Sequence, residues 1–305
     1  MERAATSRAV ERIETVREAQ GRSEALRAAG RRLALVPTMG CLHEGHLSLA
    51  RLARRHADAV WVSIFVNPTQ FGPGEDFERY PRTLEADLAL CAAEGVDGLF
   101  LPPVAEMYPA GAQTAVEVGE LARPLCGRDR PGHFRGVATV VAKLFLATRP
   151  HVAVFGQKDF QQLAVIRRMA RDLHFDVEIV GAPIAREPDG LARSSRNRLL
   201  DAESRRQAPA LARALAAAER ALSAGERRTA ALEHLVRLEL DKAARGRVDY
   251  AELRDPETLA PAPVELVGPT LLALAVKFQA DGGVVRLIDN RVLMPPSPAE
   301  DRPCS

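Results

Sequence analysis

The chain has 305 residues, with 42 basic and 40 acidic side chains and a formal net charge of +2. This length allows a full hydrophobic core in one large or two smaller domains, and the balanced charge argues against nucleic acid or a membrane surface as a partner. No run of 18 apolar residues is present, and the first 30 residues lack the apolar core of a signal peptide. The four cysteines show no paired spacing, so we expect free thiols and a cytoplasmic protein.

The first half of the chain alternates between strand-type and helix-type patterns. Residues 1–30 are predicted to form one helix, because Val10, Ile13, Val16 and Ala19 recur at helical spacing. Strands are predicted from the short apolar runs at 33–36, 59–66, 97–101, 151–155 and 175–180. Helices are predicted between these strands, one of them starting at Pro81 and one covering 137–147. The alternation predicts an α/β fold, with a Rossmann-like parallel sheet and helices on both faces.

The character of the sequence changes after Arg186. Turn residues at 187–190 indicate a hinge, and an Ala-rich helical stretch follows from 202 to 244, with a break near 223–225. Strand-type runs follow at 248–253, 271–278 and 284–288, and the last two flank the turn of a predicted hairpin at 281–283. We therefore predict a first domain over 1–186, a smaller α+β C-terminal domain over 187–294, and a disordered tail over 295–305.

Residues 33–50 read LALVPTMGCLHEGHLSLA, which indicates a strand, a short loop and a helix. Pro37 is expected to end the strand, and Gly40 permits a tight turn. His43 and His46 lie where the helix should begin. Unpaired N–H groups and a partial positive charge at a helix start favour a phosphate group.

The paired histidines allow three interpretations. In the first, Gly45 lets phosphate oxygens approach the backbone, and His46 donates a hydrogen bond to a phosphoryl oxygen in a transition state. In the second, both are loop histidines on an exposed edge, because a four-letter motif recurs by chance. Zinc binding is the weakest, since no cysteine or further histidine follows at a ligand-like spacing.

Polar clusters follow three of the predicted strands, at 38–46, 67–70 and 157–159. Ligands of parallel sheets bind beyond the carboxyl ends of the strands, so we expect these clusters to converge. Lys158 belongs to the third cluster. Only four of the 42 basic residues are lysines, so a lysine in a polar motif is mildly informative.

Lined up in order, these motifs resemble those of the pantothenate synthetase (pantoate–β-alanine ligase) family. The matching stretches are PTMGCLHEGHLSL at 37–49, FVNPTQF at 65–71, YPRTLEADL at 80–88, PGHFRGV at 131–137, GQKDFQQL at 156–163, REPDGLARSSRNRLL at 186–200 and RLIDN at 286–290. The motif HxGH alone marks only the wider nucleotidyltransferase superfamily. The ordered set covers nearly the whole chain and is much more specific.

The resemblance implies an AMP-forming ligase of vitamin B5 and coenzyme A biosynthesis. Pantoate would attack the α-phosphate of ATP, giving pantoyl adenylate and pyrophosphate, and β-alanine would then release AMP and form pantothenate. Mg²⁺ is the implied cofactor, with Asp87 as its contact. The resemblance also implies a homodimer whose smaller domain closes over the site.

The resemblance assigns roles to residues within the matching motifs. The catalytic residues would be His46, His43, Lys158 and Arg196. ATP would be bound by Pro37, Met39, Gly40, His43, Gly45, His46, Gly156, Gln157, Lys158, Asp159, Ala185, Arg193, Ser194, Ser195 and Arg196. Pantoate and β-alanine would be bound by Gln70, Gln162, Asn67, Tyr80 and His133.

These residue types suit the implied chemistry. Adenylyl transfer needs positioning and charge neutralisation, and the histidines are expected to supply charge together with Lys158, Arg196 and Mg²⁺. The amides of Gln70 and Gln162 can both donate to and accept from the hydroxyl groups of pantoate. Arg193 stands where the family usually has an apolar residue, which leaves its contact with the nucleotide open.

Two other functions compete with the ligase. An HxGH nucleotidyltransferase acting on another small substrate would leave Gln70, Gln162 and the segment 194–197 without an explanation. A nucleotide-binding module without turnover is disfavoured by the intact residues His46, Lys158 and Arg196.

Overall fold

The computed structural model describes residues 10–72, 77–280 and 283–295. The chain divides into two compact units. The first comprises the residues up to Ala185 together with Arg193–Ser195, and the second comprises Arg186–Ala192 and the residues from Arg196 onwards. No helix within the described ranges is long and apolar enough to cross a membrane.

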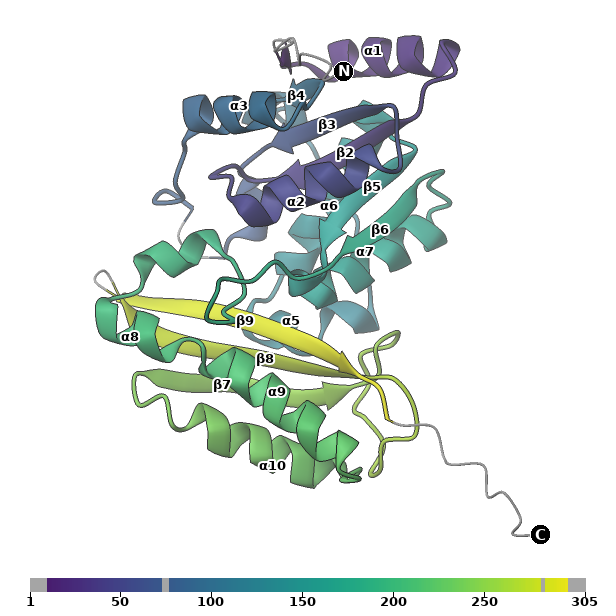
Figure 1. The fold of residues 1–305 in the computed structure, drawn as a ribbon. Coiled ribbons are helices and arrows are strands. Elements are labelled where there is room, and N and C mark those ends of the chain that lie inside the picture. Colours follow the sequence, from purple (N-terminus) through teal and green to yellow (C-terminus); the bar gives the residue numbers. More distant parts are fainter. Residues whose placement is uncertain (1–9, 73–76, 281–282, 296–305) are drawn as a thin grey trace, which may run out of the picture. The chain divides into compact units, whose positions relative to one another are not determined.

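A parallel sheet forms the centre of the first unit and confirms the predicted fold class (Figure 1). Within the described ranges its strands are β1 (Glu11–Ile13), β2 (Leu33–Thr38), β3 (Ala59–Ile64), β4 (Gly98–Phe100), β5 (Val152–Gly156) and β6 (Glu178–Ala182). They pair in the order β1-β4-β3-β2-β5-β6, all in parallel. The chain continues from β2 to β3 on one side, while β5 lies on the other. Ligands bind at such a switch point in α/β sheets.

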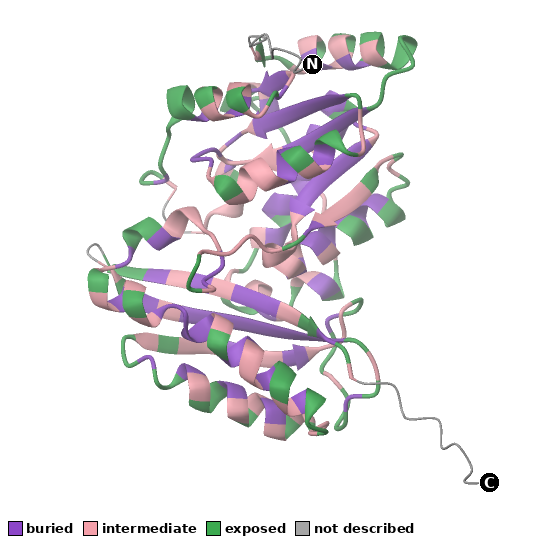
Figure 2. Cartoon of the chain, in the orientation of Figure 1, coloured by how far each residue is buried: buried purple, intermediate pink, exposed green. Residues whose placement is uncertain are grey.

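Helices cover this sheet on both faces. The longer ones are α1 (Val16–Ala28), α2 (Glu44–Arg54), α3 (Leu84–Ala93), α6 (His133–Thr148) and α7 (Phe160–Asp172). Figure 1 shows α2 in front of the sheet and α6 behind it. Side chains of α2 and α3, such as Leu49 and Cys91, share a core with Val36, Val60 and Leu99 of the strands. Figure 2 shows the central strands buried, which explains their apolar sequences.

Short helices connect the longer elements. They are α4 (Val104–Met107), α5 (Cys126–Asp129), η1 (Pro68–Gln70), η2 (Glu120–Ala122) and η3 (Gln157–Asp159). All five lie in the segments that follow β3, β4 and β5. Single helical turns of this kind are too short to give a periodic apolar pattern.

The prediction of one helix over residues 1–30 is wrong. Helix α1 begins at Val16, and Glu11–Ile13 forms the edge strand β1 beside β4. Thr15 marks the boundary, because its side chain accepts a hydrogen bond from the backbone N–H of Glu18 and so caps the helix. Residues 1–9 lie outside the described ranges.

Three predicted boundaries also move. Pro37 does not end its strand but lies within β2, beyond the residues of β2 that pair with β5, so its missing N–H group costs little. Helix α3 begins at Leu84 and not at Pro81. Helix α6 begins at His133, four residues before the prediction, so His133 is a helical residue and not a loop residue.

Helices pack on one face of an antiparallel sheet in the second unit. The helices are α8 (Ala202–Gln207), α9 (Ala210–Ser223) and α10 (Thr229–Leu240), and η4 (Ser195–Leu199) precedes them. The strands β7 (Gly246–Arg254), β8 (Thr270–Ala280) and β9 (Gly283–Leu293) pair in that order. Leu211, Leu215 and Leu222 of α9 are buried in the core with Leu232 and Val236 of α10, as their spacing predicts. Most of the predicted turn at 281–283 and almost all of the tail lie outside the described residues.

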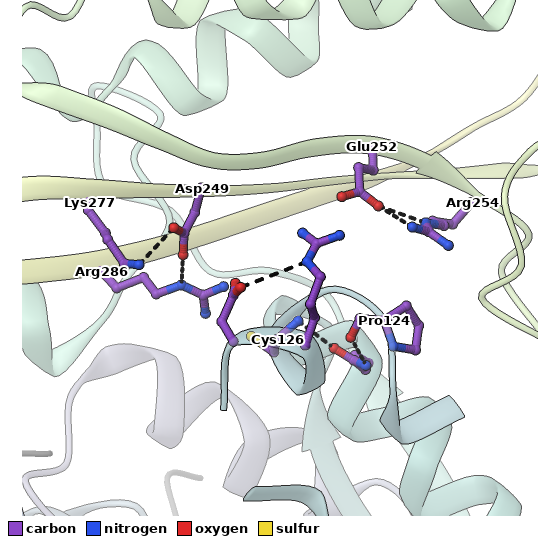
Figure 3. Close-up of polar contacts among 10 residues, drawn as sticks. Pro124, Cys126, Asp249, Glu252, Arg254, Lys277 and Arg286 are labelled. Atoms are coloured by element: carbon purple, nitrogen blue, oxygen red, sulfur yellow. Dashed lines mark hydrogen bonds and ion pairs between the residues drawn. The ribbon is translucent and has the colours of Figure 1, made fainter. Parts of the chain in front are cut away.

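Ion pairs cross-link the strands of this second sheet (Figure 3). Asp249 lies in a β-bulge of β7, and its carboxylate accepts hydrogen bonds from Lys277 Nζ of β8 and Arg286 Nε of β9, each at 2.7 Å. Along β7, Arg254 Nε donates to Glu252 Oε2 at 2.9 Å. One carboxylate thus joins three strands, which helps to hold the sheet register.

Candidate active site

The structure brings together three loops at the carboxyl ends of β2, β3 and β5. Gln70, at the end of η1 after β3, donates from Nε2 to the Sδ atom of Met39 after β2, at 3.1 Å. Lys158, in η3 after β5, is close enough to His46 of α2 for its charge to lower the pKa of the imidazole. These loops border the switch point between β2 and β5, as the parallel topology predicts.

The two histidines cap the start of α2. His43 is the N-cap residue, and its Nδ1 accepts the backbone N–H of Gly45 at 3.1 Å. His46 Nδ1 accepts the backbone N–H of His43 at 3.3 Å, and the two rings stack with centroids 4.1 Å apart. Because each Nδ1 is an acceptor, each neutral ring carries its proton on Nε2. The helix start therefore fixes both tautomers.

Glycine at position 45 has a simpler structural explanation than the approach of a phosphate group to the backbone. A Cβ atom at this position would lie 2.8 Å from Cε1 of the His43 ring. Only glycine lets His43 fold back over the backbone and cap the helix. Gly40 is also constrained, because its φ of +83° lies in the left-handed region, and a Cβ would lie 3.1 Å from Oδ2 of Asp87.

His46 is neutral at neutral pH. Burial lowers the pKa of its imidazole to about 3, and the neighbouring His43 ring and the positive charge of Lys158 act in the same direction. The expectation that His46 supplies positive charge is therefore wrong for the protein without ligand. The imidazole instead offers a neutral Nε2–H donor, while Lys158 supplies the charge.

A pH-dependent stability is expected from this buried ring. The unfolded chain binds a proton at His46 near pH 6.5, whereas the folded protein does so only near pH 3, so the free energy of unfolding should fall as the pH drops through this window. The contribution is at most about 1.4 kcal/mol per pH unit. Urea unfolding of the wild type and His46→Asn at pH 5, 6 and 7 measures it. Equal slopes in the two proteins would contradict the lowered pKa.

Gln70 is held in place by both its backbone and its side chain. Its backbone carbonyl accepts a hydrogen bond from His133 Nδ1 at 2.8 Å, and its Oε1 accepts one from Asn67 Nδ2 at 3.1 Å. Tyr80 is only 7% exposed and packs edge-on against Phe71. The structure thus places Asn67, Gln70 and His133 together, with Tyr80 in the aromatic packing behind them.

The adjacent glutamines of α7 have different environments. Gln161 is buried, and its amide binds the backbone of Leu121, Pro124 and Cys126, two of which are labelled in Figure 3. Gln162 is half-buried, and no hydrogen-bond partner for its amide is found among the described residues. Gln162 therefore keeps polar atoms that can bind a ligand, and its contact with pantoate stays a prediction, whereas Gln161 braces a loop. The sequence alone, two adjacent glutamines, does not indicate which of them is buried and which is accessible.

The segment 193–195 lies beside the start of α2. The backbone N–H of Arg193 donates to the carbonyl of Ala185 at 2.9 Å, and Arg193 Cβ lies 3.8 Å from the position of a Cβ on Gly45. Ser194 and Ser195 follow directly. Arg193 is therefore near the phosphate-suited helix end. Arg196 belongs to the second unit, and its role at the phosphates stays a prediction.

Asp87 does not fit a direct contact with Mg²⁺. Its side chain is 1% exposed, Oδ2 accepts the N–H of Cys41 at 2.9 Å, and Oδ1 accepts the N–H of Leu42 at 2.7 Å. Thr83 donates a further hydrogen bond to Oδ1. No cluster of metal-ligating side chains occurs in the described part of the chain. The carboxylate instead anchors the loop that leads into α2, a role the sequence did not reveal.

Asp87→Asn is expected to loosen this loop. The amide nitrogen would face a backbone N–H donor and leave it unpaired, which should lower the free energy of unfolding by about 1–3 kcal/mol. Glu85→Gln is the matched control, because the Glu85 side chain is 85% exposed on the same helix. Urea titration of both variants checks the difference. An Asp87→Asn midpoint equal to that of the control would show that the anchor contributes nothing.

Comparison with known proteins agrees with this site. A phosphate-suited loop at the switch point of a parallel sheet is typical of nucleotide-binding α/β enzymes. The family model described as pantoate-β-alanine ligase matches residues 9–292. The pantothenate synthetase of Syntrophobacter fumaroxidans is 55% identical over 283 residues, which cover 93% of this chain and 98% of the relative. That of Geobacter sulfurreducens is 56% identical over 282 residues, which cover 92% of this chain and 98% of the relative.

Solved structures show the same similarity. The crystal structure of pantothenate synthetase from Thermus thermophilus matches with a TM-score of 0.86 and 47% identity, over 94% of this chain and 100% of that one. The ligase from Francisella tularensis, solved with β-γ ATP and β-alanine, matches with a TM-score of 0.73 and 30% identity. The match covers 93% of this chain and 98% of that one. The chain belongs to the pantoate–β-alanine ligase family. It is therefore an enzyme that condenses pantoate with β-alanine using ATP.

Proposed function

We propose that the condensation runs in two steps through pantoyl adenylate. In the first step a carboxylate oxygen of pantoate attacks the α-phosphorus of ATP, and the bond to the bridging oxygen breaks as pyrophosphate leaves. In the second step the amine of β-alanine attacks the acyl carbon, and the acyl–oxygen bond breaks to release AMP. The β-alanine nitrogen loses two protons to solvent, one when its ammonium becomes the attacking amine and one as the amide forms. Two contacts support this proposal: Lys158 is close enough to His46 to lower its pKa, and Gln70 contacts Met39 in the loop that leads into α2.

His46 and Lys158 have complementary roles in this proposal. The Nε2–H group of His46 donates to an α-phosphate oxygen as negative charge grows on it, without a proton transfer. The Lys158 ammonium neutralises charge on the leaving pyrophosphate. Gly156, Gln157 and Asp159 flank Lys158 and would border the nucleotide. The N-terminal end of α2 contributes its dipole.

Mg²⁺ is proposed to arrive with ATP. It usually keeps several waters and binds substrate phosphates, so ATP itself can supply its oxygen ligands. Asp87 is left out of this role because its two oxygens already hold the loop. Pantoate is proposed to bind at Gln70 and Gln162, and the roles of Asn67, Tyr80 and His133 in binding pantoate or β-alanine remain predictions. So do the homodimer, the closing of the second unit and the cytoplasmic location.

An isotope experiment tests the two-step route. The enzyme is incubated with ATP, Mg²⁺, β-alanine and pantoate carrying heavy oxygen in its carboxylate. Attack by that carboxylate followed by acyl transfer must leave one heavy oxygen in AMP. Pyrophosphate should also form without β-alanine, in an amount equal to the enzyme. Release of ADP and phosphate, or unlabelled AMP, would overturn the adenylate mechanism.

A further inference from the structure

We propose that Tyr108 is a positioning residue for pantoate, which fixes the amide of Asn67 and through it the amide of Gln70. The inference rests on the proposed function of Gln70 as a pantoate contact. Tyr108 directly follows α4, outside every motif that links the chain to its family. Its role arises because its side chain comes into contact with that of Asn67 only in the folded first unit.

Asn67 is the centre of the network. It is 1% exposed, and its Oδ1 accepts hydrogen bonds from Tyr108 Oη at 2.8 Å, from Thr69 Oγ1 at 2.9 Å and from the Thr69 backbone N–H at 3.3 Å. Its Nδ2 donates to the carbonyl of Gly136 and to Gln70 Oε1, each at 3.1 Å. A flipped amide would set its NH₂ group against the backbone N–H of Thr69, which can only donate, and its oxygen against the carbonyl of Gly136, which can only accept. The amide therefore has one possible orientation.

The orientation of Asn67 determines that of Gln70. Because Gln70 Oε1 accepts from Asn67, its Nε2 must point the other way, where its one hydrogen-bond partner among the described residues is the Sδ atom of Met39 at 3.1 Å. A thioether is a weak acceptor. Gln70 thus offers N–H donors to a ligand and has no need of a donor from it. The substrate group that it selects is an oxygen acceptor, a carboxylate or hydroxyl oxygen of pantoate.

Tyr108 is suited to hold this arrangement. Burial raises the pKa of its phenol above the usual value, so the hydroxyl keeps its proton and remains a donor. The ammonium of Lys143 lies 5.5 Å from the centre of the Tyr108 ring, which favours the observed ring position. Gly136 lets η1 approach α6, since a Cβ there would lie 2.4 Å from the carbonyl oxygen of Thr69. Tyr108 donates a hydrogen bond to Asn67, and Asn67 donates one to Gln70, so Tyr108 acts on Gln70 through the Asn67 amide.

The test measures pantoate binding by calorimetry in a double-mutant cycle. Tyr108→Phe keeps the ring and removes one hydrogen bond to Asn67, which should weaken pantoate binding about 2–10-fold, with ATP binding unchanged. Thr69→Val removes the other hydroxyl from the same oxygen and should act similarly. In a Gln70→Leu background, Tyr108→Phe should add less than about twofold, because the residue through which it acts is gone.

The outcomes separate the two proposals. If Gln70→Leu weakens pantoate binding but Tyr108→Phe does not, or if the two effects add in full, Tyr108 has no positioning role. If Gln70→Leu itself leaves pantoate binding unchanged, the proposed role of Gln70 is wrong and the positioning role falls with it. Urea unfolding of each variant in a single cooperative transition, with the variant fully folded under the assay conditions, excludes a general loss of fold.

Discussion

His46→Asn is expected to slow adenylate formation by about 10²–10³-fold, the usual cost of losing one preorganised donor to a transition-state oxyanion. The asparagine Oδ1 takes nearly the position of Nδ1 and can still accept the N–H of His43, so the cap of α2 is retained. What disappears is the Nε2–H group. Single-turnover release of pyrophosphate measures the rate, and urea unfolding at pH 7 should give a free energy close to that of the wild type.

His46→Gln is the matched variant. Its amide nitrogen reaches roughly the position of Nε2, but it has no acceptor at the position of Nδ1. We expect Gln to keep more of the rate than Asn and to lose more of the stability. If both variants lose rate and stability in parallel, His46 acts only by holding the helix start, and its proposed hydrogen bond to the phosphate is wrong.

Lys158→Arg is expected to lose most adenylation activity, on the order of 10²-fold and nearly as much as Lys158→Ala, although the charge is kept. Lysine is a compact charge on a flexible stem that can follow a departing pyrophosphate, whereas the planar arginine fork favours fixed bidentate geometry. The chain uses lysine at only four of 42 basic positions, so a neutral substitution to arginine would be common.

The same single-turnover assay shows whether position 158 requires a lysine or accepts any cation. Lys277→Arg serves as control, since Lys277 pairs with Asp249 in the second unit and has no proposed contact with substrate. An Lys158→Arg enzyme within a few-fold of the wild type would mean that any cation suffices at this position. The argument from a point charge would then be wrong.

The fold was largely predictable because its main signals are local. Alternating apolar runs gave the parallel sheet, and the spacing of Leu211, Leu215 and Leu222 gave the buried face of α9. Errors occur where a long-range contact decides the structure. The edge strand Glu11–Ile13 exists because it pairs with β4, almost 90 residues away, and β6 begins at Glu178 and not at 175 because its pairing with β5 starts there.

The site was predictable in its location but not in its electrostatics. The HxGH pattern and the ends of β3 and β5 indicated the loops that carry His46, Gln70 and Lys158. The neutrality of His46 depends on burial by the folded loops, and the anchoring role of Asp87 depends on two backbone N–H groups 45 and 46 residues away. Tyr108 carried no motif at all. Such roles come from contacts across the chain that no short pattern encodes.

The single orientation of the Asn67 amide has a consequence for redesigning the enzyme. An engineer who wants a ligase for an acid without pantoate's hydroxyl groups would naturally make the Gln70 position apolar. That change removes one of the two acceptors of Asn67 Nδ2 and leaves part of a buried amide unpaired. Substrate range at this pocket is therefore linked to stability, and a useful redesign must change positions 67, 70 and 108 together.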